Sequence, residues 1–265
     1  MRRGLIGLGH RPSLARWLAG GVPEVECLEL TAEHFFDAPD AAISAIGERY
    51  PCSVHGLGLS LGTPGPLDSA TFTGYSRVAR LAQARWATEH VAFTRAGGID
   101  LGHLNPLAPT RDSLQLLTEH ALEVHEATGL PVCLENITSQ LEIAGTMSEP
   151  EFLNALCSAP HVGLLMDVTN LFINAHNHGF DARGWLSELQ PGVVRQIHVV
   201  GYGEQGGRLV DDHRVAIQTE LLDLMAAIAM RHEVEAVILE RDLDIPGPVE
   251  LLGELSRVGR SLGWS

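Results

Sequence analysis

The stretch Val162-Gly-Leu-Leu-Met-Asp-Val-Thr-Asn170 begins as a short apolar run and ends in polar residues. Runs of this kind recur along the chain and alternate with longer segments of helical periodicity. Eight runs are predicted to form strands: residues 5–8, 25–30, 53–59, 86–93, 131–135, 162–167, 193–200 and 236–240. The alternation predicts parallel strands connected by helices, because a parallel pair needs a long crossover.

Three of the intervening segments carry clear helix signals. The helix predicted over residues 110–128 begins with a capping threonine and ends before Gly129. Ser148-Glu-Pro-Glu151 has the spacing of a capping box, with a proline in the first turn, where its missing N–H costs nothing. A long apolar helix is expected over residues 215–231.

Eight strands and eight helices fit either a closed barrel or an open doubly wound sheet. An open nucleotide-binding sheet should show G-x-G-x-x-G after its first strand. Here Gly4-Leu-Ile-Gly7-Leu-Gly9 lies within the first predicted strand, with the wrong phasing. The 265 residues are close to the roughly 250 of a typical β/α barrel. We therefore predict an α/β fold, a (β/α)8 TIM barrel, as a single domain over residues 1–265.

Composition restricts the possible partners. Lys+Arg 18 against Asp+Glu 33 gives a formal net charge of −15, which disfavours nucleic acid and anionic membranes as partners. No signal segment and no apolar stretch of about 20 residues is visible, so a soluble, cytoplasmic protein is expected. The cysteines form no C-x-x-C pair and are expected to be reduced core residues: Cys27, Cys52, Cys133 and Cys157.

Barrel enzymes build their active sites at the carboxyl ends of the strands. From the third strand to the eighth, each predicted strand places a histidine or carboxylate at or near its end: His55, Glu89, His90, Glu135, Asp167, His198 and Glu240. Asp211 and His213 follow the seventh strand. Singly, each could be a helix cap or an ordinary core or loop residue. Together they predict one cluster at the barrel mouth.

Such a cluster implies bound cations. Carboxylates crowded at one mouth repel one another and take up protons, and burying an uncompensated ion costs several kcal/mol. Mixed imidazole and carboxylate ligands favour iron, zinc or manganese over magnesium or calcium. The number of candidate ligands exceeds what one ion can take, so two or three ions are predicted.

Other residues are weaker candidates. Glu29 and Glu33 are expected to hydrogen-bond a metal-binding histidine. Cys133 shares strand parity with Glu135 but is expected to pack in the core. His176 and His178 are expected on a loop where they could touch substrate. Four further histidines are expected at the surface or on helix faces: His120, His125, His161 and His232. The absence of G-x-S-x-G, P-loop and H-E-x-x-H motifs argues against serine hydrolase, NTPase and zincin chemistry.

Several short segments carry a family resemblance through their order and spacing: His55-Gly-Leu-Gly-Leu-Ser-Leu-Gly62, Glu89-His-Val-Ala-Phe93, Leu134-Glu-Asn136, Met166-Asp-Val-Thr-Asn170, Asn177-His-Gly179, Ile197-His-Val-Val-Gly201, Asp211-Asp-His213 and Glu240-Arg-Asp242. Over nearly its whole length the chain resembles the multinuclear non-haem iron-dependent oxidative enzymes. That family includes the iron-binding subunits of methanobactin and 3-thiaglutamate biosynthesis, and it is similar to xylose-isomerase-like barrels.

The resemblance implies three metal positions. The first would be held by His55, His90 and Glu135. Glu135 would bridge to a second ion held by Asp167, His198 and Glu240. A third would use Asn170, Asp211 and His213. The cofactor would be two or three iron ions, mixed Fe(II)/Fe(III), with dioxygen as co-substrate, and Glu135 and His90 would be the catalytic residues.

The resemblance also implies a substrate. Members of the family use dioxygen to modify ribosomally made precursor peptides of natural-product biosynthesis (RiPP biosynthesis), commonly at cysteine, and a partner protein usually binds the leader peptide. This chain departs from the family at His10, where an apolar residue is expected, and at His34, where asparagine is usual. With His178, these residues are predicted to contact substrate.

Two alternatives remain open. One is a divalent-metal (zinc or manganese) hydrolase or sugar isomerase on a barrel like that of xylose isomerase or endonuclease IV. The charge of −15 disfavours a DNA enzyme, and the chain has no lysine of the kind that isomerases use. The other is a non-catalytic scaffold subunit, which the complete ligand set disfavours.

Overall fold

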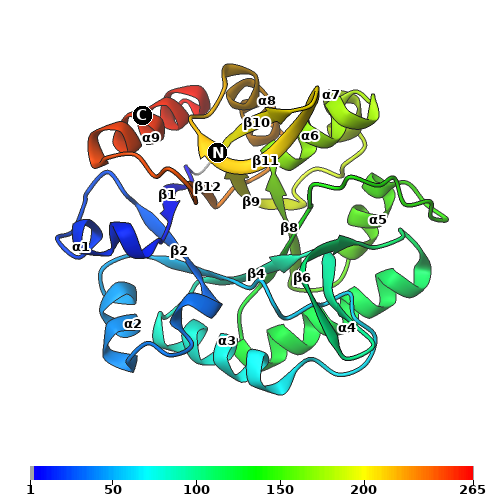
Figure 1. The fold of residues 1–265 in the computed structure, drawn as a ribbon, viewed down its shortest axis with the longest axis horizontal. Coiled ribbons are helices and arrows are strands. Elements are labelled where there is room, and N and C mark those ends of the chain that lie inside the picture. Colours follow the sequence, from blue (N-terminus) through cyan, green and yellow to red (C-terminus); the bar gives the residue numbers. More distant parts are fainter. Residues whose placement is uncertain (1–2, 265) are drawn as a thin grey trace.

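The computed structural model describes residues 3–264. Eight parallel strands close into a barrel in the order β1-β12-β9-β8-β7-β4-β3-β2 (Figure 1). The strands are β1 (Leu5–Gly9), β2 (Cys27–Thr31), β3 (Cys52–His55), β4 (Trp86–His90), β7 (Val132–Glu135), β8 (Val162–Asp167), β9 (Val194–Val199) and β12 (Ala236–Leu239). The predicted (β/α)8 TIM barrel is confirmed.

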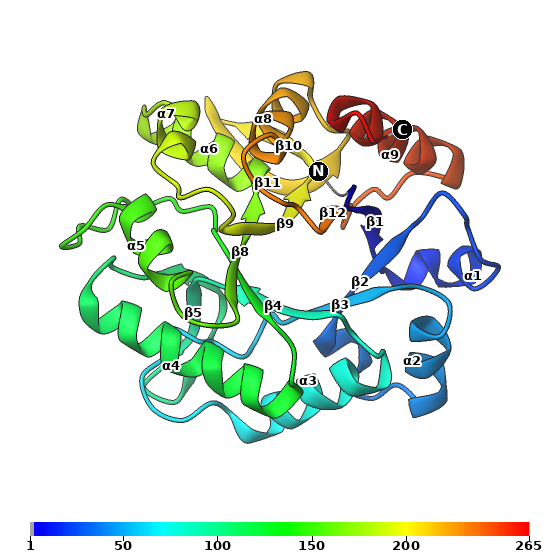
Figure 2. The same cartoon turned by 180° about the vertical axis from the view of Figure 1, so that it is seen from behind.

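Helices surround the barrel on all sides (Figure 2). They are α1 (Ala15–Leu18), α2 (Asp40–Gly47), α3 (Ser69–Leu81), α4 (Arg111–Thr128), α5 (Glu149–Leu156), α6 (Val168–His178), α7 (Ala182–Ser187), α8 (Thr219–Ala229) and α9 (Pro248–Leu262), with 3₁₀ turns η1 (Pro12–Leu14) and η2 (Ala32–Phe35). The Thr110 side chain caps α4, and Ser148 and Glu151 form the predicted capping box of α5.

Two antiparallel hairpins were not predicted. β5 (Ala92–Ala96) with β6 (Ile99–Pro106) follows the end of β4, and β10 (Gly201–Gln205) with β11 (Arg208–Val215) follows the end of β9. The strand expected over residues 86–93 therefore ends at His90, and the helix expected from residue 215 begins only at Thr219. Each hairpin turns at a Gly-Gly pair with positive φ, which suits a tight turn. The two Gly-Gly pairs were the signal in the sequence from which these hairpins could have been predicted.

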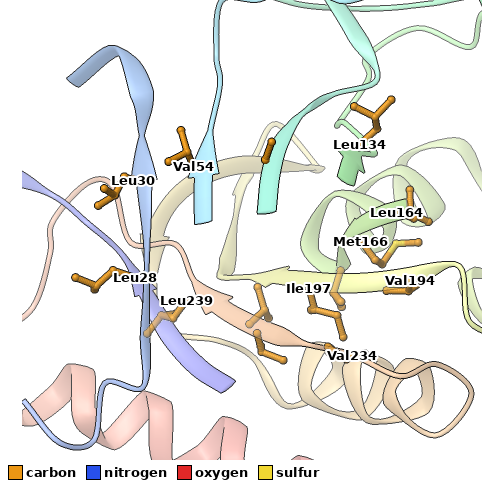
Figure 3. Packing of buried hydrophobic residues seen from close by; sticks show 14 of the residues in the cluster. Leu28, Leu30, Val54, Leu134, Leu164, Met166, Val194, Ile197, Val234 and Leu239 are labelled. Carbon is orange, nitrogen blue, oxygen red and sulfur yellow. The ribbon is translucent and has the colours of Figure 1, made fainter. Parts of the chain in front are cut away.

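The main hydrophobic core lies between the strands and the helices. Because side chains alternate along a strand, one set points outward to the helices, including Leu28, Leu30, Val54, Leu134, Leu164, Met166, Ile197 and Leu239 (Figure 3). A smaller cluster joins Cys27, Trp86, Ala236 and Ile238. The residues between these positions point the opposite way and line the barrel interior. For the same reason, the polar side chains at the strand ends point into the barrel.

The glycine-rich first strand serves packing. A Cβ at Gly7 would lie 2.2 Å from the carbonyl oxygen of Cys27, so only glycine allows β1 to approach β2 this closely. All four cysteines are free thiols, as predicted. No helix in residues 3–264 is long and apolar enough to cross a membrane.

Three histidine expectations were wrong. His176 and His178 lie within α6, not on a loop. His120 does lie on a face of α4, as expected, but this face is buried, and its ring nitrogens lie 2.7 and 2.9 Å from the carbonyl oxygens of Leu61 and Gly65. His232 is buried because it accepts a backbone hydrogen bond from Gly192.

Candidate metal centre

The side chains at the strand ends converge in two groups inside the mouth of the barrel. The first contains His55 of β3, His90 of β4 and Glu135 of β7, and the second contains Glu135, Asp167, His198 and Glu240. Within each group, one potential ligand atom per residue lies within 4.8 Å of all the others, and every side chain is buried. Glu135 belongs to both groups.

The first group presents three donor atoms to one point. Nε2 of His55 lies 3.3 Å from Nε2 of His90 and 3.5 Å from Oε2 of Glu135. Nε2 of His90 lies 3.6 Å from the same Glu135 oxygen. Two imidazole nitrogens and one carboxylate oxygen at these separations could coordinate a single transition-metal ion.

The second group is richer in oxygen. Nδ1 of His198 lies 3.5 Å from Oε1 of Glu135 and 3.2 Å from Oε2 of Glu240, and Asp167 completes the group. The Glu135 carboxylate thus turns Oε2 to the first group and Oε1 to the second. A carboxylate divided in this way has the geometry to bridge two ions.

Each histidine of the two groups is held through its other ring nitrogen. Nδ1 of His55 lies 2.9 Å from the Thr88 hydroxyl, and Nδ1 of His90 lies 3.3 Å from Oε2 of Glu89. Partners of this kind fix the orientation and tautomer of a metal-binding imidazole. Nε2 of His198 is held in the same way, 2.6 Å from Oε1 of Glu29.

The expected contact of Glu29 with a histidine is therefore confirmed, but that of Glu33 was wrong. Oε1 of Glu33 accepts the backbone N–H groups of Leu57 and Gly58 at 2.9 and 2.8 Å, because η2 places it against the loop after β3. The Glu33 carboxylate therefore binds the backbone of this loop and not an imidazole.

Beneath the two groups lies a buried polar layer, centred on Glu29. Oε2 of Glu29 accepts hydrogen bonds from the Ser53 hydroxyl at 2.9 Å and from Nε2 of Gln196 at 2.6 Å. The Gln196 carbonyl in turn accepts from the indole of Trp86. Sequence reasoning missed these residues, although Ser53 and Gln196 share strand parity with His55 and His198.

The electrostatics of the metal-free centre are strained. Burial, together with the charges of Glu135 and Asp211, raises the pKa of Asp167 well above its usual range. Burial lowers the pKa of His198, but Glu29 and Glu240 outweigh it and raise that pKa well above the usual value. Oε2 of Glu135, Oδ2 of Asp167 and Nδ1 of His198 are buried without a hydrogen-bond partner. These unpartnered donor atoms fit two bound cations.

The residues predicted to hold a third ion, Asn170, Asp211 and His213, are arranged differently from the two groups above. Nε2 of His213 pairs with Asp211 at 2.8 Å, and its Nδ1 pairs with Asp242 at 3.0 Å. Asn170 donates from Nδ2 to the backbone carbonyl of Asn136 at 3.1 Å, and its Oδ1 accepts from Thr138. Both amide atoms of Asn170 thus have partners within the protein, whereas Nδ1 of His213 is buried beside Asp242 without a hydrogen bond, and a third metal position stays a prediction.

A buried arginine borders the second group. Nη2 of Arg11 lies 3.2 Å from Oε1 of Glu240, and its Nε donates to Oδ1 of Asp242 at 2.5 Å. No local pattern in the sequence places Arg11 here, because its partners are more than 200 residues away in the chain.

The sequence that carries this geometry matches a known family. The family of the RiPP precursor modification enzymes MbnB/TglH/ChrH matches the chain over residues 5–262. The chain belongs to this family. RiPPs are ribosomally made peptides that are modified after translation, so the chain is a member of a peptide-modifying enzyme family.

Two bacterial relatives lie at moderate sequence distance. A UPF0276 protein of Chromobacterium violaceum is 32% identical over 263 residues, covering 98% of this chain and 95% of the relative. A UPF0276 protein of Bordetella parapertussis is 33% identical over 265 residues, covering 97% and 92%. These names assign no reaction.

Solved structures support the fold of this family member. Endonuclease IV of Thermus thermophilus superposes with a TM-score of 0.63 at 17% identity, covering 98% of this chain and 100% of the other. The IolI protein with a bound zinc atom superposes with a TM-score of 0.60 at 15% identity, covering 97% and 96%. At these identities the likeness shows the barrel alone.

The residues predicted to contact substrate are spread over three places. His34 lines the mouth cavity of this RiPP-family barrel, which has a volume of about 970 Å³. His10 is buried and packs against Phe35, with ring centroids 5.2 Å apart. His178 lines a neighbouring cavity, where Nε2 lies 2.8 Å from the carbonyl oxygen of Ser139.

Proposed function

We propose that this chain is an iron- and dioxygen-dependent oxidase that modifies a ribosomally made precursor peptide at a cysteine. The observation that carries the proposal is the divided carboxylate of Glu135, which faces a nitrogen-rich group on one side and an oxygen-rich group on the other. The proposal treats residues 1–265 as one barrel domain with a multinuclear site at its carboxyl face.

The donor sets suit two unlike iron ions. The first group offers two imidazoles and one shared carboxylate, which suits Fe(II). The second offers three carboxylates and one imidazole, and its harder oxygen donors favour Fe(III). Bound iron would supply the electrons and the open coordination positions that dioxygen and a substrate thiolate require.

The chain's own residues hold this arrangement in place. Thr88, Glu89 and Glu29 fix the three imidazoles, each through the nitrogen that faces away from the cluster. Arg11 binds Oε1 of Glu240 and leaves Oε2 facing His198. The mouth cavity, about 970 Å³, is large enough for a peptide segment and not only for a cysteine.

Two further elements of the proposal concern its setting. A partner protein would present the leader peptide, while the mouth receives the segment to be modified. The enzyme would work in the cytoplasm, where a reducing environment keeps the substrate cysteine as a free thiol.

Anaerobic reconstitution with Fe(II) tests the proposal directly. We expect at least two irons per chain and oxygen consumption that depends on a cysteine-containing precursor peptide. Glu135→Ala should lose iron and activity together, because it removes the shared ligand of both groups. Fewer than two irons per chain, or no peptide-dependent oxygen uptake, would contradict the proposal.

The alternative is a zinc or manganese hydrolase or isomerase. It stays open because endonuclease IV and the zinc-bound IolI protein have the same fold. Zinc or manganese in the purified protein, with turnover that is unaffected when oxygen is removed, would favour it. Full function of Glu135→Ala would instead favour a scaffold role.

A further inference from the structure

A second cavity lies beside the mouth, and we call it the side pocket. It has a volume of about 200 Å³, and most of its lining is apolar: Val91, Leu107, Ile137, Phe152, Leu153 and Phe180. Leu141 and Ile143 line it as well, although 65% and 37% of their surfaces are exposed. A cavity with this lining suits an apolar group better than an ion.

The side pocket adjoins the mouth cavity. The segment that follows β7, residues 136–139, contributes to both linings, and Ile137 lines the two cavities. Glu135, the carboxylate shared by both donor groups, is only two residues before Ile137. A peptide with its cysteine at the metal centre therefore needs to extend only past this thin wall to reach the side pocket.

The wall between the cavities is held rigidly. Asn170, Asn174 and His178 are spaced four residues apart on one face of α6, and all three contact the backbone of this segment. Asn174 donates to the carbonyl of Ile137 at 2.9 Å and accepts from the N–H of Ser139 at 2.9 Å. This wall of the pocket is thus in place before any ligand arrives, which lowers the entropic cost of binding.

We propose that the side pocket binds an apolar side chain of the precursor peptide, close in sequence to the modified residue. This inference rests on the proposed peptide-modifying function and names a specificity determinant for it. Leu141 and Ile143 form an apolar rim next to a polar, acidic mouth, and a peptide that enters the mouth covers this rim as it passes. A loop of a partner protein is the competing occupant, and variants of the rim distinguish the two.

Peptide binding to the iron-reconstituted protein under argon provides the first test. The probes are fluorescein-labelled nonapeptides of glycine and serine with a central cysteine, carrying one leucine at each other position in turn. We expect leucine at one or two positions to lower Kd about tenfold relative to the leucine-free peptide, as full burial of one apolar side chain predicts. Aspartate at the same positions should abolish the gain. Equal affinity for all the peptides, or no binding by any, would overturn the inference.

Variants of the exposed rim provide the second test. L141D/I143D should remove the leucine-dependent gain, so that the leucine peptides bind this variant no more tightly than the leucine-free peptide does. Met230→Asp is the matched control, because Met230 is 71% exposed and lies at the end of α8, outside both cavity linings. A double variant that keeps the full gain would assign the rim to a partner protein and overturn the peptide pocket.

Iron content and oxygen uptake are measured on the same samples. If the wild-type protein shows no leucine dependence while its iron content and oxygen uptake are intact, the side pocket alone is rejected. Absence of iron or of oxygen uptake would reject the proposed oxidase, whatever the peptide affinities are.

Discussion

Oε1 of Glu29 lies 2.6 Å from Nε2 of His198, and both side chains are almost completely buried inside the barrel. The contact leaves Nδ1 of His198 facing Glu135 and Glu240. A carboxylate behind a metal-binding imidazole raises its basicity and fixes its tautomer. In the proposed centre, Glu29 would therefore prepare His198 for coordination through Nδ1.

Glu29→Gln should weaken metal binding without removing a ligand. The amide keeps the volume of the carboxylate but lacks its charge, so we expect a loss in affinity for one ion of roughly 10- to 100-fold, the range typical of such outer contacts. Competition with a chelator measures the affinity. Glu24→Gln, on an exposed glutamate, is the control. Equal metal affinity in both variants would contradict the role of Glu29.

Replacing Arg11 should lower the stability of the metal-free protein. Its guanidinium pairs with Glu240 and Asp242, and Arg11→Met removes this buried cation and leaves the two carboxylates with only His198 and His213 beside them. Breaking a buried ion pair costs about 3–5 kcal/mol, so the free energy of unfolding should fall by about that amount. Bound metal should recover part of the loss, because it supplies positive charge to Glu240.

Urea denaturation with and without metal measures this effect. Arg195→Met is the matched control, because Arg195 pairs with Glu235 at the exposed surface, where an ion pair contributes less than about 1 kcal/mol. Equal losses for the two arginine variants would show that Arg11 is no more than a surface charge.

The sequence predicted the barrel and the ligand groups for one physical reason. Parallel strands end at the same rim, so a polar residue closing an apolar run, such as Asp167 after Val162, must lie near its counterparts. Strand parity then aims Glu135 and His198 inward.

The remaining features depend on contacts that leave no local pattern. Arg11 meets Asp242 across 231 positions, and the Asn170, Asn174 and His178 face of α6 binds the backbone of a neighbouring loop. Backbone partners have no sequence signature. His10 follows the inward-facing Gly9, but the chain turns there and packs the ring on Phe35.

Metal uptake should release protons at neutral pH. Burial lowers the pKa of His90, but Glu135 and Glu89 outweigh it and raise the pKa to about 9. His90 is therefore protonated at pH 7 in the metal-free protein and must lose this proton to coordinate an ion. Apparent metal affinity should rise from pH 6 towards pH 9. Calorimetry in two buffers of different ionisation enthalpy counts the protons, and a flat affinity over this range would contradict the prediction.

His232 should make the metal-free protein less stable in mild acid. Burial, with the nearby charge of Arg231, lowers its pKa to about 4, and Nδ1 accepts the backbone N–H groups of Gly192 and Val194 at 3.1 and 3.4 Å. The folded state therefore favours the neutral ring. No penalty exists above the unfolded pKa of about 6.5, and the penalty grows as the pH falls from there to about 4.

His232→Asn isolates this contribution, because the amide oxygen can accept the same hydrogen bonds and does not titrate. Wild type should be the more stable protein at pH 7, and its advantage should shrink by pH 5, because the imidazole takes up a proton in the unfolded chain but stays neutral in the folded protein. Urea midpoints of the metal-free proteins at pH 7, 6 and 5 measure the difference, with His176→Asn on the exposed side of α6 as the control for loss of an imidazole. A stability difference between wild type and His232→Asn that stays constant with pH would show that the buried imidazole does not resist protonation.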